Sequence, residues 1–173
     1  MSLIATLVVV GLGTIATTLW LIWKEIPAND EVKVHRILDG DTVIVVSGWR
    51  KQTIRLASID CPEEGQDWNK NATAGLIKMI GGKTVKVDAH TKDMHGRKVA
   101  TLHVFDVQSK SWINVNTLMV AKGHAWVHRN FLDHLEPRHK NELYRLERCA
   151  RDKRVGLWCH SNPIPPWQWR QLK

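Results

Sequence analysis

Much of the chain between residues 32 and 105 alternates between apolar and polar positions with the period of two that is typical of β-strands. Val32 and Val34 alternate with polar neighbours up to a turn signal at Asp39-Gly40. The next stretch is β-branched and apolar, as expected for a buried strand. We predict five strands, over 32–38, 42–46, 52–59, 83–90 and 97–105.

A helical pattern of apolar residues interrupts the strands once, and two more helical segments follow the last strand. Apolar residues within 68–80 fall on one helical face, and two glycines follow. Asn114 can cap a second, short helix that ends before Gly123, and Pro137 suits the first turn of a third that runs to about Lys153. Five short strands with one helix between the third and fourth predict an α+β protein, an OB-type five-stranded β-barrel with three α-helices.

A different pattern fills the N-terminus, where residues 3–23 carry no charge. About 20 apolar residues suffice to cross a bilayer as a helix, and Trp20, Trp23 and Lys24 suit its interfacial end. We therefore expect one N-terminal transmembrane helix, an uncleaved anchor or signal, with secretion after cleavage near Ala28 as the alternative. The predicted parts are an anchor over 1–24, a linker over 25–31, a barrel domain over 32–160 and a Pro/Trp-rich tail over 161–173.

Charge and cysteine content narrow the function classes. The 173-residue chain has a net charge of +8, which favours polyanions such as nucleic acid or an anionic membrane face, although a merely basic soluble protein has the same excess. The composition excludes a disordered or collagen-like chain. Three cysteines are too few for a disulfide scaffold. Cys149 and Cys159 can pair in an oxidising compartment or remain free thiols.

Three short runs carry the candidate chemistry: Asp39-Gly40-Asp41-Thr42, the stretch 54–63, and Asp93-Met94-His95-Gly96-Arg97. Each run alone is typical of a turn, a strand-surface ion pair or a hairpin. Together and in this order they provide acidic oxygens, a further carboxylate and two guanidinium groups. Cleavage of a phosphodiester needs a positioned water, a base and cations that stabilise charge on the transition-state oxygens. The combination therefore favours a phosphodiester-cleaving site.

Within these runs each residue type suits one task. Asp41 and Asp60 lie on different predicted strands that a barrel can bring together, and their carboxylates are hard ligands for Ca²⁺ or Mg²⁺. Thr42 and the backbone carbonyl of Cys61 are further candidates beside them. Glu63 follows Pro62 and can orient a water or take its proton.

Two arginines complete the predicted catalytic set. Arg55 and Arg97 can each grip phosphate oxygens in a two-pronged manner that lysine cannot copy. A second basic and aromatic group, Trp126, His128 and Arg129, can stack and bind nucleic-acid bases. A place in the core is the alternative for Trp126.

These motifs resemble those of the staphylococcal nuclease (thermonuclease) family from about Val32 to Trp158. The residues that carry the resemblance are Asp39-Gly40-Asp41-Thr42, Arg55-Leu56, Asp60-Cys61-Pro62-Glu63, Asp93, Gly96-Arg97 and Gly156-Leu157-Trp158. The resemblance implies an OB-type barrel that hydrolyses DNA and RNA with Ca²⁺ and leaves 3′-phosphate ends.

The resemblance also implies roles for individual residues. Asp41 and Asp60 look like the calcium carboxylates, the Cys61 carbonyl like a further ligand, and Asp39 like an acid behind them, with Thr42 beside it. Glu63 looks like the general base or water-orienting group, and Arg55 and Arg97 like the clamps of the transition state. His95 stands where the family has an aromatic residue near the phosphate, which implies a nucleic-acid contact of altered stacking.

We accordingly expect a membrane-anchored, Ca²⁺-dependent endonuclease of low sequence specificity that acts on DNA, RNA or both as a monomer. A non-catalytic, membrane-tethered nucleic-acid-binding OB module is the alternative. Lys24, Lys33 and Arg36 follow the predicted span and favour a cytoplasmic domain. Because free Ca²⁺ is scarce in the cytosol and a nuclease there endangers the genome, we expect the catalytic domain of this single-pass protein to be extracytoplasmic.

Overall fold

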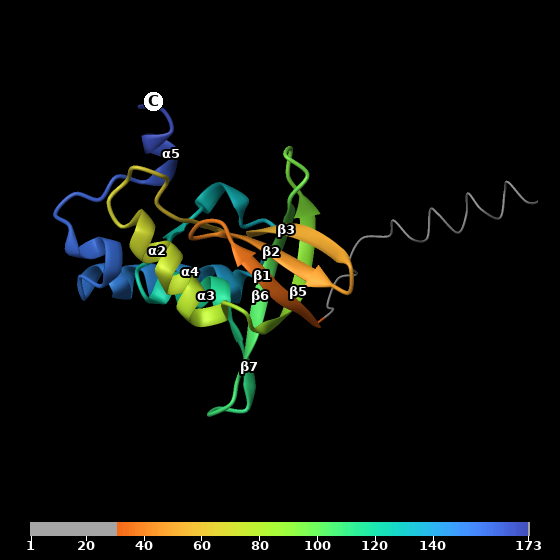
Figure 1. Ribbon diagram of the computed structural model, residues 1–173. Coiled ribbons are helices and arrows are strands. Elements are labelled where there is room, and N and C mark those ends of the chain that lie inside the picture. The colour runs from red at the N-terminus through yellow and green to blue at the C-terminus, as the bar shows by residue number, and fades with distance from the viewer. Residues whose placement is uncertain (1–30, 173) are drawn as a thin grey trace, which may run out of the picture.

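The computed structural model describes residues 31–172 and contains the predicted barrel. Four antiparallel strand pairings and one parallel pairing form it. Its strands are β1 (Glu31–Ile37), β2 (Thr42–Ser47), β3 (Arg50–Leu56), β5 (Thr84–Lys92) and β6 (Lys98–Asp106). They run in the order β3-β2-β1-β5-β6, and the parallel pairing of β3 with β6 closes the ring (Figure 1). The five-stranded barrel predicted from the alternating pattern is thus confirmed.

The alternation of the strands fills the barrel interior with apolar side chains. Most buried positions on the five barrel strands are branched aliphatic residues or alanine: Val32, Val34, Val43, Val45, Ile54, Leu56, Val85, Val87, Ala100, Leu102 and Val104. Burying a side chain of this size stabilises the fold by about 1.5–3 kcal/mol. This interior is the rigid frame on which the polar residues between the strands are mounted.

Three short strands were not predicted. The expected third strand over 52–59 ends at Leu56, because Ser58 adopts a left-handed conformation with φ 67°. The chain then re-enters a strand as β4 (Ile59–Asp60), which pairs with β8 (Trp126–Val127) outside the barrel. The prediction was wrong at this end, and the break matters because it turns Asp60 away from the line of β3. A further strand, β7 (Ser111–Asn114), extends the sheet beyond β6.

The three predicted helices are present, and they pack on the barrel and on one another (Figure 1). They are α2 (Asn69–Ile80), α3 (Val115–Ala121) and α4 (Pro137–Asp152). Asn114 caps α3 by accepting a hydrogen bond from the Thr117 N–H, as its sequence position predicts. A short helix, α5 (Pro166–Trp169), and the 3-10 turns η1 (Arg129–Phe131) and η2 (Gly156–Cys159) were not predicted.

The Gly156-Leu157-Trp158 motif is explained by a close approach of two backbones. Gly156 and Gly123 both have positive φ angles, of 65° and 64°. A Cβ on Gly156 would lie 2.2 Å from the Gly123 carbonyl oxygen, which accepts a hydrogen bond of 2.8 Å from the Leu157 N–H. Only glycine fits both positions. The contact anchors η2 to the end of α3 and lets Leu157 and Trp158 bury their side chains.

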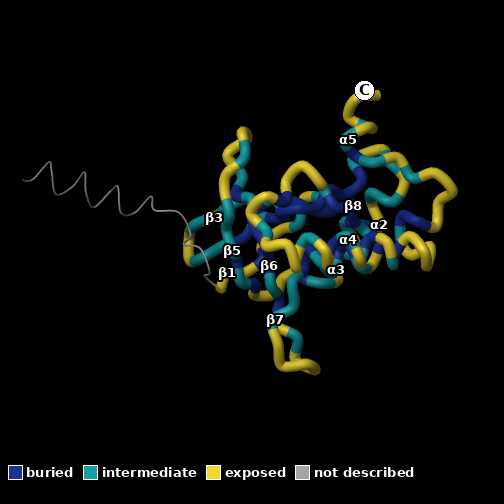
Figure 2. Tube along the Cα trace, turned by 180° about the vertical axis from the view of Figure 1, so that it is seen from behind, coloured by how far each residue is buried: buried dark blue, intermediate teal, exposed yellow. Residues whose placement is uncertain are grey.

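The C-terminal segment folds back over the domain instead of extending from it. In Figure 2 the buried stretch of β8 lies between α4 and the path to α5, while loops and hairpin tips form the exposed surface. Trp167 packs against Trp126, with ring centroids 5.7 Å apart. All three cysteines are free, so the pairing alternative for Cys149 and Cys159 is not realised in the structure.

The predicted anchor over 1–24 and most of the predicted linker lie outside the described residues. Across residues 31–172, the structure contains no helix long and apolar enough to span a bilayer.

Candidate active site

One guanidinium group joins two acidic residues from different elements, Asp41 in the turn before β2 and Asp60 in β4. Arg55 pairs with Thr42 in the β2–β3 register, which places its side chain next to Asp41, and it forms ion pairs with both Asp41 and Asp60. Its Nη2 donates to Oδ1 of Asp60 over 2.7 Å. Burial alone would lower the pKa of Arg55, but the two carboxylates raise it above its ordinary value. The arginine therefore stays charged and holds the carboxylates together.

Backbone and hydroxyl donors fix the carboxylate of Asp41, which is 6% exposed. The Cys61 N–H donates to Oδ2 of Asp41 over 2.7 Å, and the Thr42 hydroxyl lies 3.3 Å from Oδ1. Oδ1 of Asp39 accepts a hydrogen bond of 2.9 Å from the Asp41 N–H. Burial and the neighbouring charge of Asp41 raise the pKa of Asp39 to about 6. Acidic side chains are thus concentrated around the residues that the sequence analysis predicted as metal ligands.

The oxygen atoms gathered here fit a hard cation better than a soft one. Asp41 and Asp60 provide carboxylates, and Thr42 and the Cys61 carbonyl are neighbouring neutral oxygens, the kinds of ligand that Ca²⁺ takes. Burial raises the pKa of the Cys61 thiol well above its ordinary value, so no thiolate is available to a soft metal. In residues 31–172 no three His, Cys, Asp or Glu side chains are grouped to hold a metal by themselves. A cation between Asp41 and Asp60 would therefore need backbone, hydroxyl or water oxygens as well.

A pocket of about 780 Å³ opens above this cluster, and we call it the carboxylate pocket. Its lining contains almost every residue predicted for catalysis and metal binding: Asp39, Asp41, Thr42, Arg55, Cys61, Glu63, His95 and Arg97. Asp60 is 1% exposed and contacts the pocket through Arg55. The structure therefore brings all three sequence runs to one cavity.

Glu63 lies at the rim of the carboxylate pocket, where its carboxylate is accessible. Its side chain is 38% exposed, and its N–H donates to Oε1 of Gln66 over 2.7 Å. The local turn after Pro62 thereby holds the backbone of Glu63 while the carboxylate stays within reach of solvent. The carboxylate also forms an ion pair with Arg170, so only part of it is open to a water molecule in the pocket.

Arg97 enters the same pocket from the hairpin between β5 and β6. Gly96 has a φ of 76°, which lets the chain turn tightly before the strand begins. Asp93 accepts hydrogen bonds from the Arg97 N–H and Nε, over 2.9 and 2.7 Å, and from the His95 N–H over 2.9 Å. Asp93 thus fixes the plane of the Arg97 guanidinium, a role that the sequence motif did not reveal.

A third guanidinium in this pocket, that of Arg170, was missed by the sequence analysis. It comes from the residue after α5, and its Nη2 lies 2.8 Å from Oδ2 of Asp60. Its Nη1 forms an ion pair with Glu63. The hydrogen bonds to Asp60 raise the pKa of Arg170. No spacing or motif marks this arginine, because only the path of the folded tail brings it back.

The predicted nucleic-acid-binding residues are dispersed. His95 lines the carboxylate pocket, whereas Trp126, His128 and Arg129 are not part of its lining. His128 Nε2 lies 3.9 Å from Oδ2 of Asp60, and burial lowers the pKa of His128. Arg129 forms an ion pair of 3.3 Å with Glu147. Trp126 is 7% exposed and packs edge-on against Trp158, so its alternative place in the core is the observed one.

Comparison with known sequences adds independent findings. The sequence model described as staphylococcal nuclease homologue matches residues 53–160. A protein of Escherichia coli O157:H7 named "Uncharacterized endonuclease" is 36% identical over 152 residues, which cover 87% of this chain and 92% of that protein.

Two further relatives come from a bacterium and a plant. A "Micrococcal nuclease" of Shigella flexneri is 32% identical over 142 residues, covering 80% of this chain and 79% of its own. The "Staphylococcal-like nuclease CAN1" of Arabidopsis thaliana is 40% identical over 124 residues, covering 72% of this chain and 35% of its own.

Proposed function

The chain belongs to the staphylococcal nuclease family, and on that premise we propose that it is a Ca²⁺-dependent endonuclease that hydrolyses DNA, RNA or both with low sequence specificity. The observation that carries the proposal is the convergence of Asp41, Arg55, Glu63 and Arg97 on one pocket, with Asp60 beneath it. No packing requirement explains this combination of buried carboxylates and paired guanidinium groups.

In the proposed reaction Glu63 orients a water molecule and takes its proton as the water oxygen attacks the phosphorus. The bond from phosphorus to the 5′ oxygen breaks, the 3′ side keeps the phosphate, and the 5′ oxygen takes a proton from solvent. Arg55 and Arg97 donate hydrogen bonds to the non-bridging oxygens, where negative charge accumulates in the transition state. A Ca²⁺ ion held by Asp41 and Asp60 would stabilise the same charge when bound.

The pairing of Glu63 with Arg170 has a consequence for this reaction. The ion pair with Arg170 occupies an oxygen of the Glu63 carboxylate that would otherwise bind the attacking water. Arg170 must therefore release Glu63, or exchange it for a substrate phosphate, before the water is deprotonated. The tail segment that carries Arg170 is also attached to the Glu63 turn, because Gln66 Nε2 donates to the Ile164 carbonyl over 2.9 Å.

The test is digestion of a plasmid and of a single-stranded RNA with Ca²⁺ or with EDTA. We expect cleavage by the wild type with Ca²⁺, and a loss of about 10²–10⁴-fold in Glu63→Gln and Arg97→Ala. Glu142→Gln and Arg145→Ala are matched controls, because both residues are exposed on α4, outside the carboxylate pocket. The products should carry 5′-hydroxyl ends, which polynucleotide kinase labels without prior phosphatase treatment.

The alternative, a binding module without hydrolysis, predicts a different result. Tight binding of the same substrates with no cleavage in Ca²⁺ would overturn the nuclease proposal. Equal digestion by the wild type and both pocket variants would remove the proposed site.

We further propose that residues 1–24 anchor the enzyme in a membrane with its barrel domain outside the cytoplasm. The uncharged stretch 3–23 supports an anchor, and the Ca²⁺ requirement supports this orientation. Nuclease activity on substrate added to intact cells should equal that of lysed cells. Latent activity that appears only after lysis would place the domain inside.

A further inference from the structure

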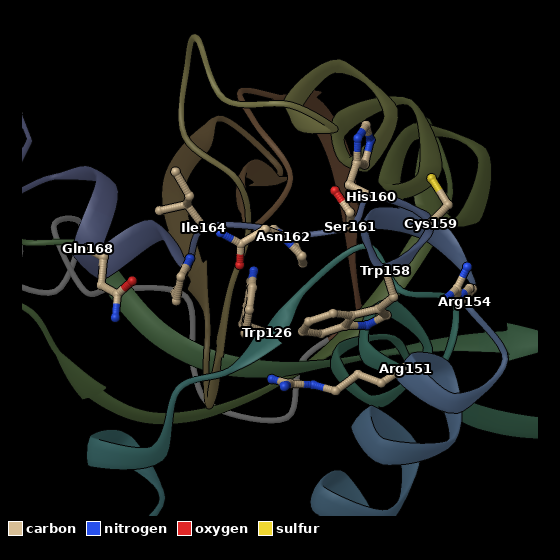
Figure 3. A pocket seen from close by; sticks show the side chains of 12 residues that line it. Trp126, Arg151, Arg154, Trp158, Cys159, His160, Ser161, Asn162, Ile164 and Gln168 are labelled. Atoms are coloured by element: carbon tan, nitrogen blue, oxygen red, sulfur yellow. The ribbon is translucent and has the colours of Figure 1, made fainter.

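A second pocket, of about 620 Å³, lies where η2 and the tail pass over β8 and the end of α4 (Figure 3). We call it the tail pocket; its side chains include Trp126, Arg151, Arg154, Trp158, His160 and Gln168. None of these residues belongs to the lining of the carboxylate pocket. The proposed hydrolysis therefore leaves this cavity without a role.

Two indoles and one arginine form a fixed wall of the tail pocket. Trp126 and Trp158 pack edge-on, with centroids 4.3 Å apart. The Arg151 guanidinium carbon lies 4.0 Å from the Trp158 ring centroid and 4.8 Å from that of Trp126. In Figure 3 the arginine side chain runs beneath both indoles. Such cation–π contacts hold a guanidinium in place while its N–H groups remain able to donate.

The charge of the tail pocket is positive. Arg151, Arg154 and His160 line it, and no carboxylate does. Two acids contact this lining: the buried Glu147 is 3.5 Å from Arg151, and the exposed Asp67 is 3.9 Å from His160. Glu147 is shared with Arg129, so it offsets Arg151 only in part.

Two N–H groups of the tail pocket's lining residues have no acidic partner. Arg154 forms no ion pair with another residue of the described part of the chain. The indole Nε1 of Trp158 is buried with no hydrogen-bond partner among residues 31–172. A cavity lined by an exposed arginine without an ion-pair partner and by no acid suits an anion and disfavours a metal cation.

The tail pocket is also linked to the carboxylate pocket. A smaller cavity of about 160 Å³ shares Trp126, His160 and Asn162 with the tail pocket and extends to Pro62. Pro62 also lines the carboxylate pocket and directly precedes Glu63. The two pockets are therefore neighbours along the tail, and one carboxylate, that of Asp67, lines the cavity between them.

We propose that the tail pocket is an accessory subsite that binds a backbone phosphate of the nucleic-acid strand, away from the bond that is cut. Arg154 and Arg151 donate to the phosphate oxygens, and the indole wall excludes water behind them. This inference rests on the proposed nuclease function. It makes long strands better ligands than short ones without adding to the chemistry at the carboxylate pocket.

The test compares Arg154→Gln with Lys153→Gln, which removes the same charge one residue earlier at an exposed position outside the tail pocket. Fluorescence anisotropy measures binding of a labelled single strand of about 20 nucleotides to each variant in the Glu63→Gln background. We expect Arg154→Gln to weaken binding about fivefold and to reduce the slope of log K against log salt by about 0.7, the value for one phosphate contact on a single strand. Lys153→Gln should change neither by as much as half.

A cleavage assay distinguishes this subsite from the reacting centre. Arg154→Gln, with Glu63 intact, should cleave a dinucleotide at the wild-type rate and long strands with a raised KM. Equal weakening by both variants, or equal loss on both substrates, would overturn the subsite. Quenching of tryptophan fluorescence by inorganic phosphate that depends on Arg154, without any effect on strand binding, would make it a free-phosphate site and also overturn the proposal. If the wild type cleaves nothing but Arg154→Gln alone weakens strand binding, the nuclease proposal fails and the subsite stands.

Discussion

Arg170 lies 2.8 Å from Asp60, although 110 residues separate the two along the chain. The arginine comes from the tail and the aspartate from a two-residue strand beside the barrel. Asp60 thereby contacts two guanidinium groups, because Arg55 lies 2.7 Å from its other oxygen. A cation that binds Asp60 competes with both arginines.

Removal of Arg170 should therefore increase the affinity for Ca²⁺. Arg170→Ala removes one positive charge from Asp60 and Glu63, and we expect a gain of about fivefold, or about 1 kcal/mol, the size of a partly screened pair. Isothermal titration with Ca²⁺ measures it without substrate. Arg138→Ala, an exposed arginine that pairs with Glu136, is the control. Unchanged or weaker Ca²⁺ binding in Arg170→Ala would show that the tail arginine does not compete with the cation.

Arg55 should be needed for stability as well as for activity. Arg55→Ala leaves the buried Asp41 and Asp60 carboxylates close together without the guanidinium group that pairs with both of them. We therefore expect a loss of about 3 kcal/mol in the free energy of unfolding. Ca²⁺ should replace the lost charge and raise the Tm of Arg55→Ala more than that of the wild type. Thermal denaturation with and without Ca²⁺ measures this, with the exposed Arg36→Ala as control. Equal Tm increments would contradict a shared cation site.

The buried Asn116 should contribute strongly to the stability of the barrel. Its Nδ2 donates to the carbonyls of Ala57 and Ala100, over 2.9 and 3.2 Å, and its Oδ1 accepts from the Leu102 N–H over 3.1 Å. Asn116→Ala removes the side-chain partner of the Ala57 carbonyl and of the Leu102 N–H, while the Ala100 carbonyl keeps its bond from the Ala57 N–H, so we expect a loss of about 3 kcal/mol in the free energy of unfolding. Asn114→Ala, which removes only the cap of α3, should cost about 1 kcal/mol. Urea unfolding measures both free-energy losses. A larger loss for Asn114→Ala than for Asn116→Ala would contradict the proposed role of the Asn116 hydrogen bonds.

His124 should make stability depend on pH. Trp68 Nε1 donates to Nδ1 of His124 over 3.1 Å, so this nitrogen carries no proton in the fold, and burial lowers the pKa of His124. A lowered pKa means that the stabilisation is complete above the unfolded value, about 6.5, and is lost as the pH falls through the folded value. The Tm of the wild type should fall more steeply between about pH 7.5 and about pH 5 than that of His124→Asn. His139→Asn, at an exposed position, should follow the wild type; parallel curves for all three would exclude this coupling.

The barrel and the predicted catalytic groups were accessible from the sequence because they depend on local patterns. The alternation of Val32 and Val34 with polar residues favours a strand, Asn114 caps a helix, and Gly96 permits the turn before Arg97. Closure of the barrel then brings the three runs together without further information. The end of the third strand was misjudged, because the left-handed Ser58 breaks a stretch whose composition still favours a strand.

Contacts between distant segments were beyond the reach of such patterns. Trp126 is an aromatic residue with basic residues close by in the sequence, so the sequence allowed either a nucleic-acid contact or a place in the core. Its strand pairing with Asp60 and its packing against Trp158 show that it is buried. Arg170 stands in a tail with no periodicity at all. Its place at Asp60 follows from the way Trp167 and Gln66 hold that tail against the domain.

The amino-acid order by itself determined the strands, the main helices and the acidic and basic groups available for chemistry, since backbone periodicity and side-chain type are properties of neighbouring residues. Only the tertiary structure decided that Arg55 and Arg170 both pair with Asp60, and that the tail forms the basic tail pocket in addition to the carboxylate pocket. Coulomb attraction acts through space and not along the chain, so charges far apart in sequence meet only where packing of the apolar core brings their backbones together.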